Sequence, residues 1–505
     1  MSVNHLRRLS SSGLTEHATP TPDRAAASTL GAALRRVGYT EEAIVDLLGD
    51  EGPGTDIAEI PVHERRLHLW PSTLATTVRL LLLQLPVELD DVNEALGREG
   101  VDALLGIGLA QSDGAVLTPR ARIVPAEGLL MAFDGFARGE DDPVGYVASY
   151  TPTASWLAAL TPRRRVGRAL DVGTGNGVHA LLAAGHSDQV IATDVNPRAL
   201  AYTEINAALN GIDNIETRLG SLFEPVAGER FDLIACNAPY VVSPESKWQY
   251  RDGGLPADEL SERVVRTAAA SLTDDGMAAL LVSWVAESEE EPDERLGEWL
   301  DGSGCDAWVL SLNAADPLDH AAGWNEHLSA DPAAYGAALD DWLAYFDSLG
   351  VGWISEGAVL LHRRGGRAHA LRVDGVDEDD LEFAGDQIER VFTAQARLAA
   401  LADDDALADE VAVLAPTVRV EQRLAPGSRE ADTWLVLDEG TNAEYELDPD
   451  VAEVVALFDG DLTLGRAIAR VGRAFDLERR ELAELRDDSL AELRDLLELG
   501  FAELK

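Results

Sequence analysis

Asp171-Val-Gly-Thr-Gly-Asn-Gly177 is the stretch that decides the fold, because it joins a strand pattern to a helix pattern. A strand is expected over residues 169–172, which overlap the start of this stretch, and residues 179–184 after it are expected to form a helix. The three glycines leave the backbone bare, so a ligand can approach the start of that helix. The dinucleotide-binding pattern needs its third glycine at position 178, where this chain has Val178.

Apolar strand patterns alternate with amphipathic helices between residues 144 and 364. This alternation is typical of a parallel sheet with helices on both faces. The predicted fold class is therefore α/β, with a Rossmann-like sheet. A helical insertion is expected near residues 333–346. The expected strands are 169–172, 190–194, 231–236, 277–284, 308–312 and 357–362.

Other patterns flank this region. Residues 1–24 are expected to form a disordered tail, because they combine Ser, Thr, Pro and Arg with no apolar run. Residues 25–140 predict a mainly helical module that is winged-helix-like, since a Ser-Asp-Gly turn joins two short apolar runs near its end. The sheet domain is assigned to 144–365, and a small α+β accessory module to 366–505.

Charge and cysteine content narrow the functional classes. Acidic residues outnumber basic ones 90 to 41 among 505 residues, which gives a net charge of −49 and disfavours an extended contact with naked RNA or DNA. The two cysteines, Cys236 and Cys305, form no disulfide framework and fit a reducing cytoplasm. The apolar run 78–85 is too short to span a bilayer. We expect a cytoplasmic protein without membrane contact or bound metal.

Asn237-Ala238-Pro239-Tyr240 follows the expected strand 231–236. The side-chain carbonyl of Asn237 and the backbone carbonyl of Ala238 are two acceptors, and Tyr240 adds an aromatic face. Such a set suits a planar NH2 group, whose lone pair is delocalised and must be aligned for in-line displacement. Pro239 is expected to stiffen the loop.

The two motifs together resemble class I methyltransferases that use S-adenosylmethionine. The tetrapeptide resembles the Asn-Pro-Pro-Tyr motif of amino-group methyltransferases, such as the release-factor glutamine methyltransferases and small methyltransferase domains. Ala238 replaces the first proline, but this position acts through its carbonyl. The resemblance implies that Asn237, Ala238, Pro239 and Tyr240 are the catalytic residues.

The same resemblance implies how the cofactor is bound. Asp171 would face the methionine ammonium of S-adenosylmethionine, and the chain would turn beneath the cofactor at Gly173, Thr174, Gly175 and Gly177.

Three further segments complete the implied cofactor site. Asp194, at the end of the next strand, would accept both ribose hydroxyls. Ser221 and Leu222 stand where related enzymes carry Asp-Leu, with the first residue at the adenine. Thr153 lies in a segment like the one that covers the cofactor in glutamine methyltransferases. Residues 250–255 resemble a Gly-Gly segment of that family.

Three functions follow from these residues. The first is N-methylation of a protein glutamine, with a translation factor as partner. The second is methylation of adenine N6 or guanine N2 in RNA, with the winged-helix-like module holding the nucleic acid. The third is a cofactor-binding scaffold without catalysis, in which Ala238 and Ser221 mark lost activity.

Overall fold

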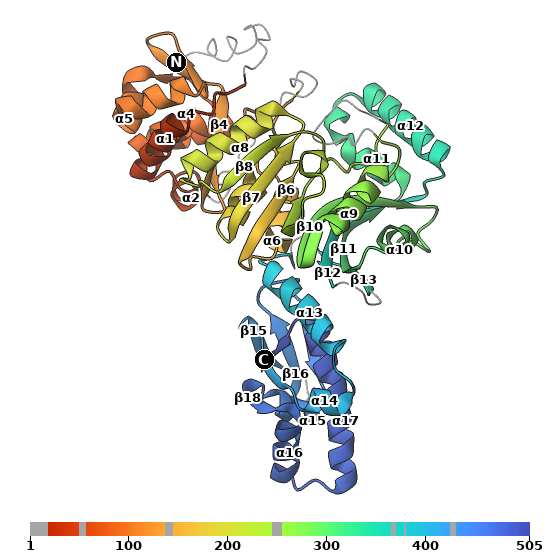
Figure 1. Ribbon diagram of the computed structural model, residues 1–505. Coiled ribbons are helices and arrows are strands. Elements are labelled where there is room, and N and C mark those ends of the chain that lie inside the picture. Colours follow the sequence, from red (N-terminus) through yellow and green to blue (C-terminus); the bar gives the residue numbers. More distant parts are fainter. Residues whose placement is uncertain are drawn as a thin grey trace.

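The computed structural model describes residues 19–49, 57–136, 145–244, 255–364, 370–377, 380–424 and 431–505. Figure 1 shows a helical N-terminal part, a large central sheet, and a C-terminal part that projects away from the sheet. Of the predicted tail, residues 1–18 lie outside the described residues. Helix α1 begins at Arg24, where the side chain of Asp23 accepts a hydrogen bond from Ala26 N. Among the described residues, no helix has both the length and the apolar character needed to cross a bilayer.

The N-terminal part combines helices with two small sheets. Strands β1, β3 and β2 form one antiparallel sheet, while β4 and β5 form a separate hairpin. Gly97, with φ of 74°, divides α5 into two helical pieces, so strand, two helices and hairpin follow in the order of a winged helix. The elements are α1 (Arg24–Val37), α2 (Glu41–Leu48), α3 (Ile60–Leu69), α4 (Thr73–Leu81), β1 (Val87–Glu88), α5 (Leu89–Gly106), β2 (Ala110–Ser112), β3 (Val116–Pro119), β4 (Ala121–Ala126) and β5 (Leu129–Asp134).

The central sheet has the strand order β13-β11-β12-β10-β9-β6-β7-β8. Strands β6 to β10 are mutually parallel, and the Val, Ile, Leu and Ala runs of β6, β7, β9 and β10 are buried, as a sheet covered on both faces requires. The strands are β6 (Val166–Val172), β7 (Ser187–Asp194), β8 (Ile215–Leu219), β9 (Phe231–Cys236), β10 (Leu272–Ala286), β11 (Cys305–Ala315), β12 (Trp353–Arg363) and β13 (Leu371–Gly375).

The observed sheet departs from the predicted one in three ways. Strand β8, at one edge, is not among the expected strands. Strand β12 runs antiparallel to both β10 and β11, so the sheet is not wholly parallel. Strand β13 pairs with β11 although it lies beyond residue 365, so the sheet extends past the predicted end of its domain. The prediction of an α/β fold with a Rossmann-like sheet is nevertheless confirmed, because all six expected strands lie in this one sheet.

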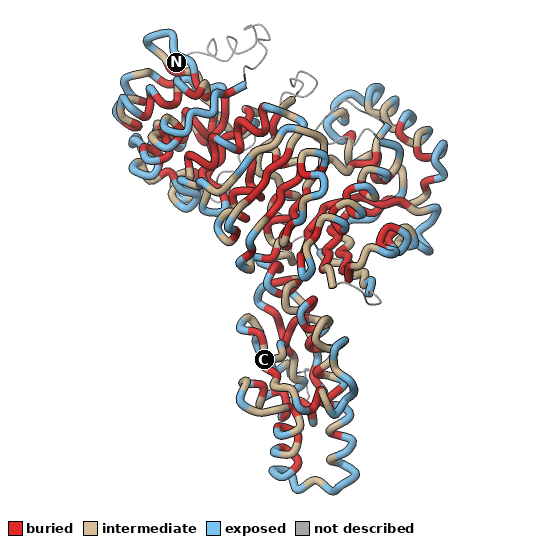
Figure 2. Tube along the Cα trace, viewed as in Figure 1, coloured by how far each residue is buried: buried red, intermediate tan, exposed pale blue. Residues whose placement is uncertain are grey.

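Helices cover both faces of the sheet, and alternate strand residues point to opposite faces. Leu170, Ile191 and Ile234 pack with α9 and α10, while the neighbouring Ala169 and Val190 pack on the side of α6, α7 and α13. Figure 2 shows the resulting buried residues along the central strands. These helices are α6 (Pro152–Leu160), α7 (Val178–Ala184), α9 (Glu259–Ser271), α10 (Glu294–Leu300) and α13 (Gly385–Leu398).

The N-terminal part and the first βα units share one hydrophobic core. Leu34 and Phe133 belong to the same buried cluster as Leu181 of α7 and Tyr202 of α8 (Pro197–Leu209). Residues on both sides of the predicted boundary at 140–144 therefore belong to one hydrophobic core.

An insertion between β11 and β12 and a C-terminal part complete the fold. The insertion contains α11 (Pro317–Trp324) and α12 (Pro332–Leu349), near the expected 333–346. The C-terminal part has its own core, in which Leu490, Leu493 and Leu497 of the last helix are buried, so the leucine stripe packs within this part. Its elements are α14 (Asp404–Ala408), β14 (Val411–Leu414), β15 (Val418–Leu424), β16 (Ala431–Leu437), β17 (Glu444–Leu447), α15 (Pro449–Val455), β18 (Asp459–Thr463), α16 (Leu464–Ala474), α17 (Arg479–Glu498) and β19 (Ala502–Leu504).

Candidate active site

A cavity of about 810 Å³ opens beyond the carboxyl ends of β6, β7 and β9. From β6 the chain adds β7 and β8 on one side of that strand, and it then adds β9 on the other side. Open α/β sheets bind ligands at such a reversal of strand order. Two predicted site residues, Asp171 and Gly177, lie outside its lining. The predicted residues that do line it are Thr153, Gly173, Thr174, Gly175, Asp194, Ser221, Leu222, Asn237, Ala238, Pro239 and Tyr240.

The glycine turn brings the two sequence motifs into contact. Gly173 has φ of 70°, and a Cβ added to it would lie 3.6 Å from the Cα of Ala238. Gly177 has φ of 89° and faces α8 instead, since a Cβ there would lie 2.9 Å from Cγ2 of Thr203. Gly173 therefore shapes the cavity floor, whereas Gly177 allows α7 and α8 to approach each other.

Asp171 supports the turn from behind the cavity wall. Its side chain is 1% exposed, and Oδ2 accepts hydrogen bonds from Oγ1 of Thr174 at 2.6 Å and from N of Ala180 at 3.0 Å. Burial raises the pKa of Asp171 to about 7, against the lowering effect of these two bonds. Oδ1 has no hydrogen-bond partner within the described part of the chain. A contact of Asp171 with the methionine ammonium stays a prediction.

Asp194 joins the glycine turn to the end of β7. Oδ2 accepts a hydrogen bond from N of Gly175 at 2.9 Å, and Oδ1 accepts one from N of Asn196 at 2.8 Å. Burial raises the pKa of Asp194, and these backbone donors oppose the rise. Each carboxylate oxygen can accept a second bond, so the side chain retains acceptors for a pair of hydroxyls on the cavity side.

The segment after β8 is tied to the same strand end. N of Gly220 donates to the carbonyl oxygen of Asp194 at 2.9 Å, and Oγ1 of Thr193 donates to that of Leu222 at 3.0 Å. Leu222 has φ of 48°, an uncommon conformation for a leucine. These bonds hold Ser221 and Leu222 on the cavity wall next to Asp194.

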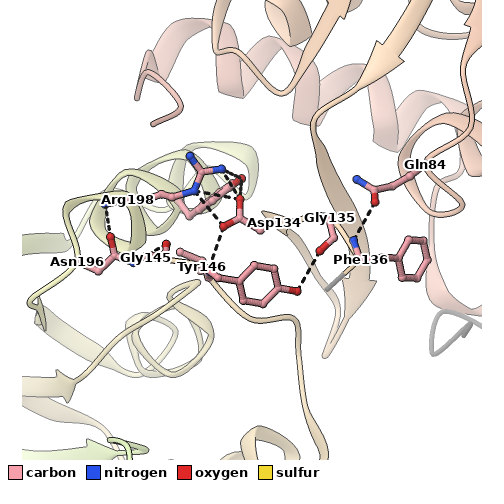
Figure 3. Close-up of polar contacts among 10 residues, drawn as sticks. Gln84, Asp134, Gly135, Phe136, Gly145, Tyr146, Asn196 and Arg198 are labelled. Carbon is pink, nitrogen blue, oxygen red and sulfur yellow. Dashed lines mark hydrogen bonds and ion pairs between the residues drawn. The ribbon is translucent and has the colours of Figure 1, made fainter. Parts of the chain in front are cut away.

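Residues 146–149 form a wall that the sequence did not predict. Tyr146, Val147, Ala148 and Ser149 line the cavity beside Thr153 in the first turn of α6. Two asparagines from the sheet domain hold this segment. Nδ2 of Asn176 donates to O of Ala148 at 3.1 Å. Nδ2 of Asn196 donates to O of Gly145 at 2.8 Å, as Figure 3 shows. The sequence gives one signal here, because Asn196 before Pro197 marks the start of α8.

Asn237 to Tyr240 lie directly after β9. Ala238 is 4% exposed, whereas Asn237 and Tyr240 are half-buried, and burial raises the pKa of Tyr240. Burial also raises the pKa of the Cys236 thiol to about 12, so this cysteine is a protonated core residue at neutral pH. Residues 250–255 were compared above with a Gly-Gly segment of the glutamine methyltransferases. Of these residues, only Leu255 lies within the described part of the chain.

The far side of the cavity is closed by α9 and the insertion. Leu260, Arg263 and Trp324 line it next to Tyr240. Nε1 of Trp324 donates to Oε1 of Glu356 on β12 at 3.2 Å. Sequence reasoning missed Trp324 because an insertion carries no motif that ties it to the site.

His320 fastens the insertion to the segment that follows Tyr240. Its Nε2 donates to O of Val242 at 3.2 Å, and burial lowers the pKa of His320 to about 4. Val241 and Val242 share a hydrophobic cluster with Trp342 and Phe346 of α12. The position of the insertion is therefore linked to that of the Asn237–Tyr240 segment.

Histidine at this site does not indicate a metal. His179 lines the cavity but is buried, and burial lowers its pKa to about 4, so it is neutral. Within residues that the structure describes, no three His, Cys, Asp or Glu side chains are grouped to hold a metal ion.

Comparisons with known proteins agree with this geometry. Residues 152–298 match the family Methyltransferase small domain, and residues 36–122 match Domain of unknown function (DUF7059). Ribosomal protein uL3 glutamine methyltransferase from Bradyrhizobium diazoefficiens is 33% identical over 168 residues, 30% of this chain and 52% of that protein. The protein of the same name from Xanthomonas campestris is 32% identical over 192 residues, which are 35% of this chain and 60% of that protein.

A third relative aligns over a shorter length. Release factor glutamine methyltransferase from Xylella fastidiosa is 42% identical over 76 residues, 15% of this chain and 28% of that protein. The chain thus spans less than two thirds of the length of each of these curated relatives. Taken with the sheet order and the cavity, the family match shows that residues 152–298 form an S-adenosylmethionine-dependent methyltransferase domain.

Proposed function

We propose that this protein is an S-adenosylmethionine-dependent N-methyltransferase whose acceptor is a planar amide, the side chain of a protein glutamine. The observation that carries the proposal is that Asn237, Ala238 and Tyr240 line the same cavity as Gly173 and Asp194. Acceptors for the N–H groups of the amide and the backbone that would lie under a nucleoside therefore face the same cavity.

The residues present fit the cofactor. Gly173 leaves bare backbone on the floor, Asp194 retains acceptor capacity for two hydroxyls, and Oδ1 of Asp171 is a buried acceptor below the turn. We assign Thr153, Ser221 and Leu222 to the walls that enclose the nucleoside. When bound, S-adenosylmethionine supplies the methyl group from its sulfonium.

The chain's own residues position the acceptor. The Asn237 side-chain carbonyl and the Ala238 backbone carbonyl each accept one N–H of the amide, which orients the nitrogen lone pair toward the cofactor side of the cavity. Such positioning contributes roughly 7–11 kcal/mol of barrier reduction in favourable cases. Tyr240, whose raised pKa keeps the phenol neutral, contributes an aromatic face against the planar group. A strong general base is unnecessary, since methylation acidifies the nitrogen.

Protein glutamine is favoured over RNA by two observations. The relatives described above are named for glutamine methylation in a ribosomal protein and in a release factor. The net charge of −49 opposes binding to a polyanion. A glutamine in a translation factor or ribosomal protein would place the reaction in the cytoplasm.

The winged-helix order of the N-terminal part is the observation that keeps RNA as a second candidate. Its second helical piece, after Gly97, is the one that would enter a groove. Yet Val101 and Leu104 are buried, and a Cβ on Gly100 would lie 3.0 Å from Cβ of Ala33 on α1. The exposed charged residues of that piece are Arg98, Glu99 and Asp102, and the ion pair between Arg98 and Asp102 leaves no excess of positive charge for phosphate.

One labelling experiment tests the proposed function. The protein is incubated with S-adenosylmethionine carrying a radioactive methyl group and with lysate of its own organism, and the product is digested with protease or ribonuclease. We expect label that protease releases and that amino-acid analysis assigns to N-methylglutamine. Label removed by ribonuclease alone would establish the RNA candidate instead. Cofactor binding without any transfer would support the non-catalytic scaffold.

A further inference from the structure

The wall formed by residues 146–149 is fixed from two directions. The sheet domain holds it through Asn176 and Asn196, as described above. The N-terminal part holds it through the end of the β4–β5 hairpin, where Asp134 and Gly135 lie against Tyr146 and Val147 (Figure 3). Neither of these hairpin residues lines the cavity itself.

Asp134 binds Val147 through both its backbone and its side chain. N of Asp134 donates to O of Val147 at 3.2 Å, and N of Val147 donates to Oδ2 of Asp134 at 2.9 Å. The hydroxyl of Tyr146 donates to O of Gly135 at 3.0 Å. Two consecutive residues of the cavity wall therefore depend on the last residues of the hairpin.

The Asp134 carboxylate is itself held by α8. Nε of Arg198 donates to both carboxylate oxygens at 3.0 Å, Nη2 of Arg198 also contacts Oδ1, and the Tyr202 hydroxyl donates to Oδ1 at 2.8 Å. Asp134 is 5% and Arg198 8% exposed. A buried ion pair is stable only when its remaining hydrogen-bonding groups are satisfied, and here Val147 and Tyr202 take part in doing so.

Asn210, the residue that follows the last turn of α8, docks another part of the hairpin, and within the described chain its hydrogen bonds do not go to residues 146–149. Oδ1 of Asn210 accepts from N of Leu130 at 2.9 Å, and Nδ2 of Asn210 donates to O of Leu130 at 2.8 Å. Asn210 therefore anchors the same hairpin to the same helix as the Asp134–Arg198 pair. Unlike Asn210, the Asp134–Arg198 pair is bonded directly to the wall, through Val147.

We infer that Asp134 is a positioning residue through which the N-terminal part sets the affinity of the enzyme for its cofactor. The inference rests on the proposed function, because it takes the wall at 146–149 to enclose S-adenosylmethionine. Loss of the Asp134 carboxylate leaves the Val147 N–H without its acceptor and the Arg198 guanidinium buried without its counter-charge. The wall then loses its fixed position, and cofactor binding must order it again.

The test compares Asp134→Ala with Asn210→Ala in the full chain. S-adenosylhomocysteine is the probe, and its dissociation constant is measured by titration calorimetry. We expect Asp134→Ala to weaken binding about tenfold or more, the effect of losing one hydrogen bond to a charged group. Asn210→Ala, which loosens the same hairpin elsewhere, is expected to leave the dissociation constant unchanged. Asp134→Asn keeps an acceptor for Val147 and is expected to bind more tightly than Asp134→Ala.

Two further readouts separate positioning from general destabilisation. Hydrogen exchange of residues 145–149 is expected to accelerate in Asp134→Ala and not in Asn210→Ala. In the labelling reaction, the cofactor concentration for half-maximal transfer is expected to rise while the maximal rate at saturating cofactor is retained. Equal weakening by Asp134→Ala and Asn210→Ala, or no weakening by Asp134→Ala, would overturn the inference. Failure of the unchanged protein to bind the probe would instead contradict the proposed function.

Discussion

Asn237 stands on the cavity wall immediately after β9, and Ala238 beside it is buried next to Gly173. We predict that Asn237→Ala lowers methyl transfer by about 100-fold or more, because one preorganised carbonyl dipole at the acceptor nitrogen is lost. Affinity for S-adenosylhomocysteine is expected to stay unchanged, since the glycine turn and Asp194 are untouched. Calorimetry and radiolabel transfer measure the two effects, and undiminished transfer would remove Asn237 from the mechanism.

The buried carboxyl of Asp171 predicts a pH dependence of stability. Its folded pKa of about 7 lies above the ordinary value of 3.8, so the folded protein binds the proton more tightly than the unfolded chain does. This contribution to stability is complete below about pH 4 and is lost as the pH rises through about 7. Asp171→Asn cannot titrate but keeps an acceptor for Thr174.

The melting temperature of Asp171→Asn relative to the unchanged protein is therefore expected to rise between about pH 4 and pH 7 and to level off above that range. Thermal unfolding across this range measures the difference, in which the other titrating groups cancel. A difference that does not change with pH would show that Asp171 is ionised throughout.

Site residues that belong to a recognisable sequence motif could be predicted from the sequence. Site residues that act by bonding a distant segment of the chain could not. Asp194 and Asn237 were predicted because each follows a strand that has a strong apolar run. Asn176 and Asn196 were missed as parts of the wall, since each binds a carbonyl 28 or 51 residues earlier in the chain. Asparagine is common in turns and helix caps, so its presence alone does not indicate such a contact.

At the scale of elements, hydrophobic runs predicted the central strands but not their direction or the edges of the sheet. β12 has the same apolar character as the parallel strands, because burial on both faces is common to either direction. β8, Ile-Glu-Thr-Arg-Leu, is an edge strand with half-exposed side chains and lacks a continuous apolar run. β13 is likewise mixed and stands at the opposite edge.

The insertion at α11 and α12 leads to a prediction about the acceptor. Trp324 at the end of α11 lines the cavity next to Tyr240 and is held by Glu356. We predict that Trp324→Ala lowers labelling of the acceptor about tenfold or more, the effect of removing a central aromatic contact. Affinity for S-adenosylhomocysteine is expected to be retained, because Trp324 lies in the insertion and is not part of the glycine turn or of the Asp194 contacts proposed to hold the cofactor.

The matched control for this variant is Trp70→Ala, which removes a tryptophan that is 70% exposed in the N-terminal part. It is expected to leave both labelling and cofactor affinity unchanged. Equal labelling by Trp324→Ala and the unchanged protein would contradict a role of the insertion in acceptor binding.

At the scale of the whole molecule, α13 connects the sheet domain to the C-terminal part. Ile388 and Phe392 of α13 lie in the core below the sheet, whereas Ala394 lies in the C-terminal core. Gly385, at the start of α13, packs directly on the end of α6, because a Cβ there would lie 2.4 Å from O of Thr161. The sequence predicted a separate C-terminal module but not this contact, which is possible only because Gly385 has no Cβ.

We predict that Gly385→Ala displaces α13 from α6 and loosens the C-terminal part, because the clash is with backbone and costs roughly 1–3 kcal/mol. Small-angle X-ray scattering is expected to show a larger radius of gyration, with affinity for S-adenosylhomocysteine unchanged. Gly336→Ala in α12 is the control, since a Cβ there meets no atom within 4 Å. An unaltered scattering profile for Gly385→Ala would show that α13 is held by other contacts.

The contacts of the wall at 146–149 also determine when during synthesis this wall is completed. Asp134 and Gly135 precede the wall in the chain, whereas Asn176, Asn196 and the Arg198 that holds Asp134 follow it. Chains emerge from the ribosome N-terminus first, at about 5–20 residues per second. On the inference drawn above, the wall therefore takes its final position only after α8 has emerged and folded onto the hairpin, and Ser221, Leu222 and Asn237 are synthesised later still.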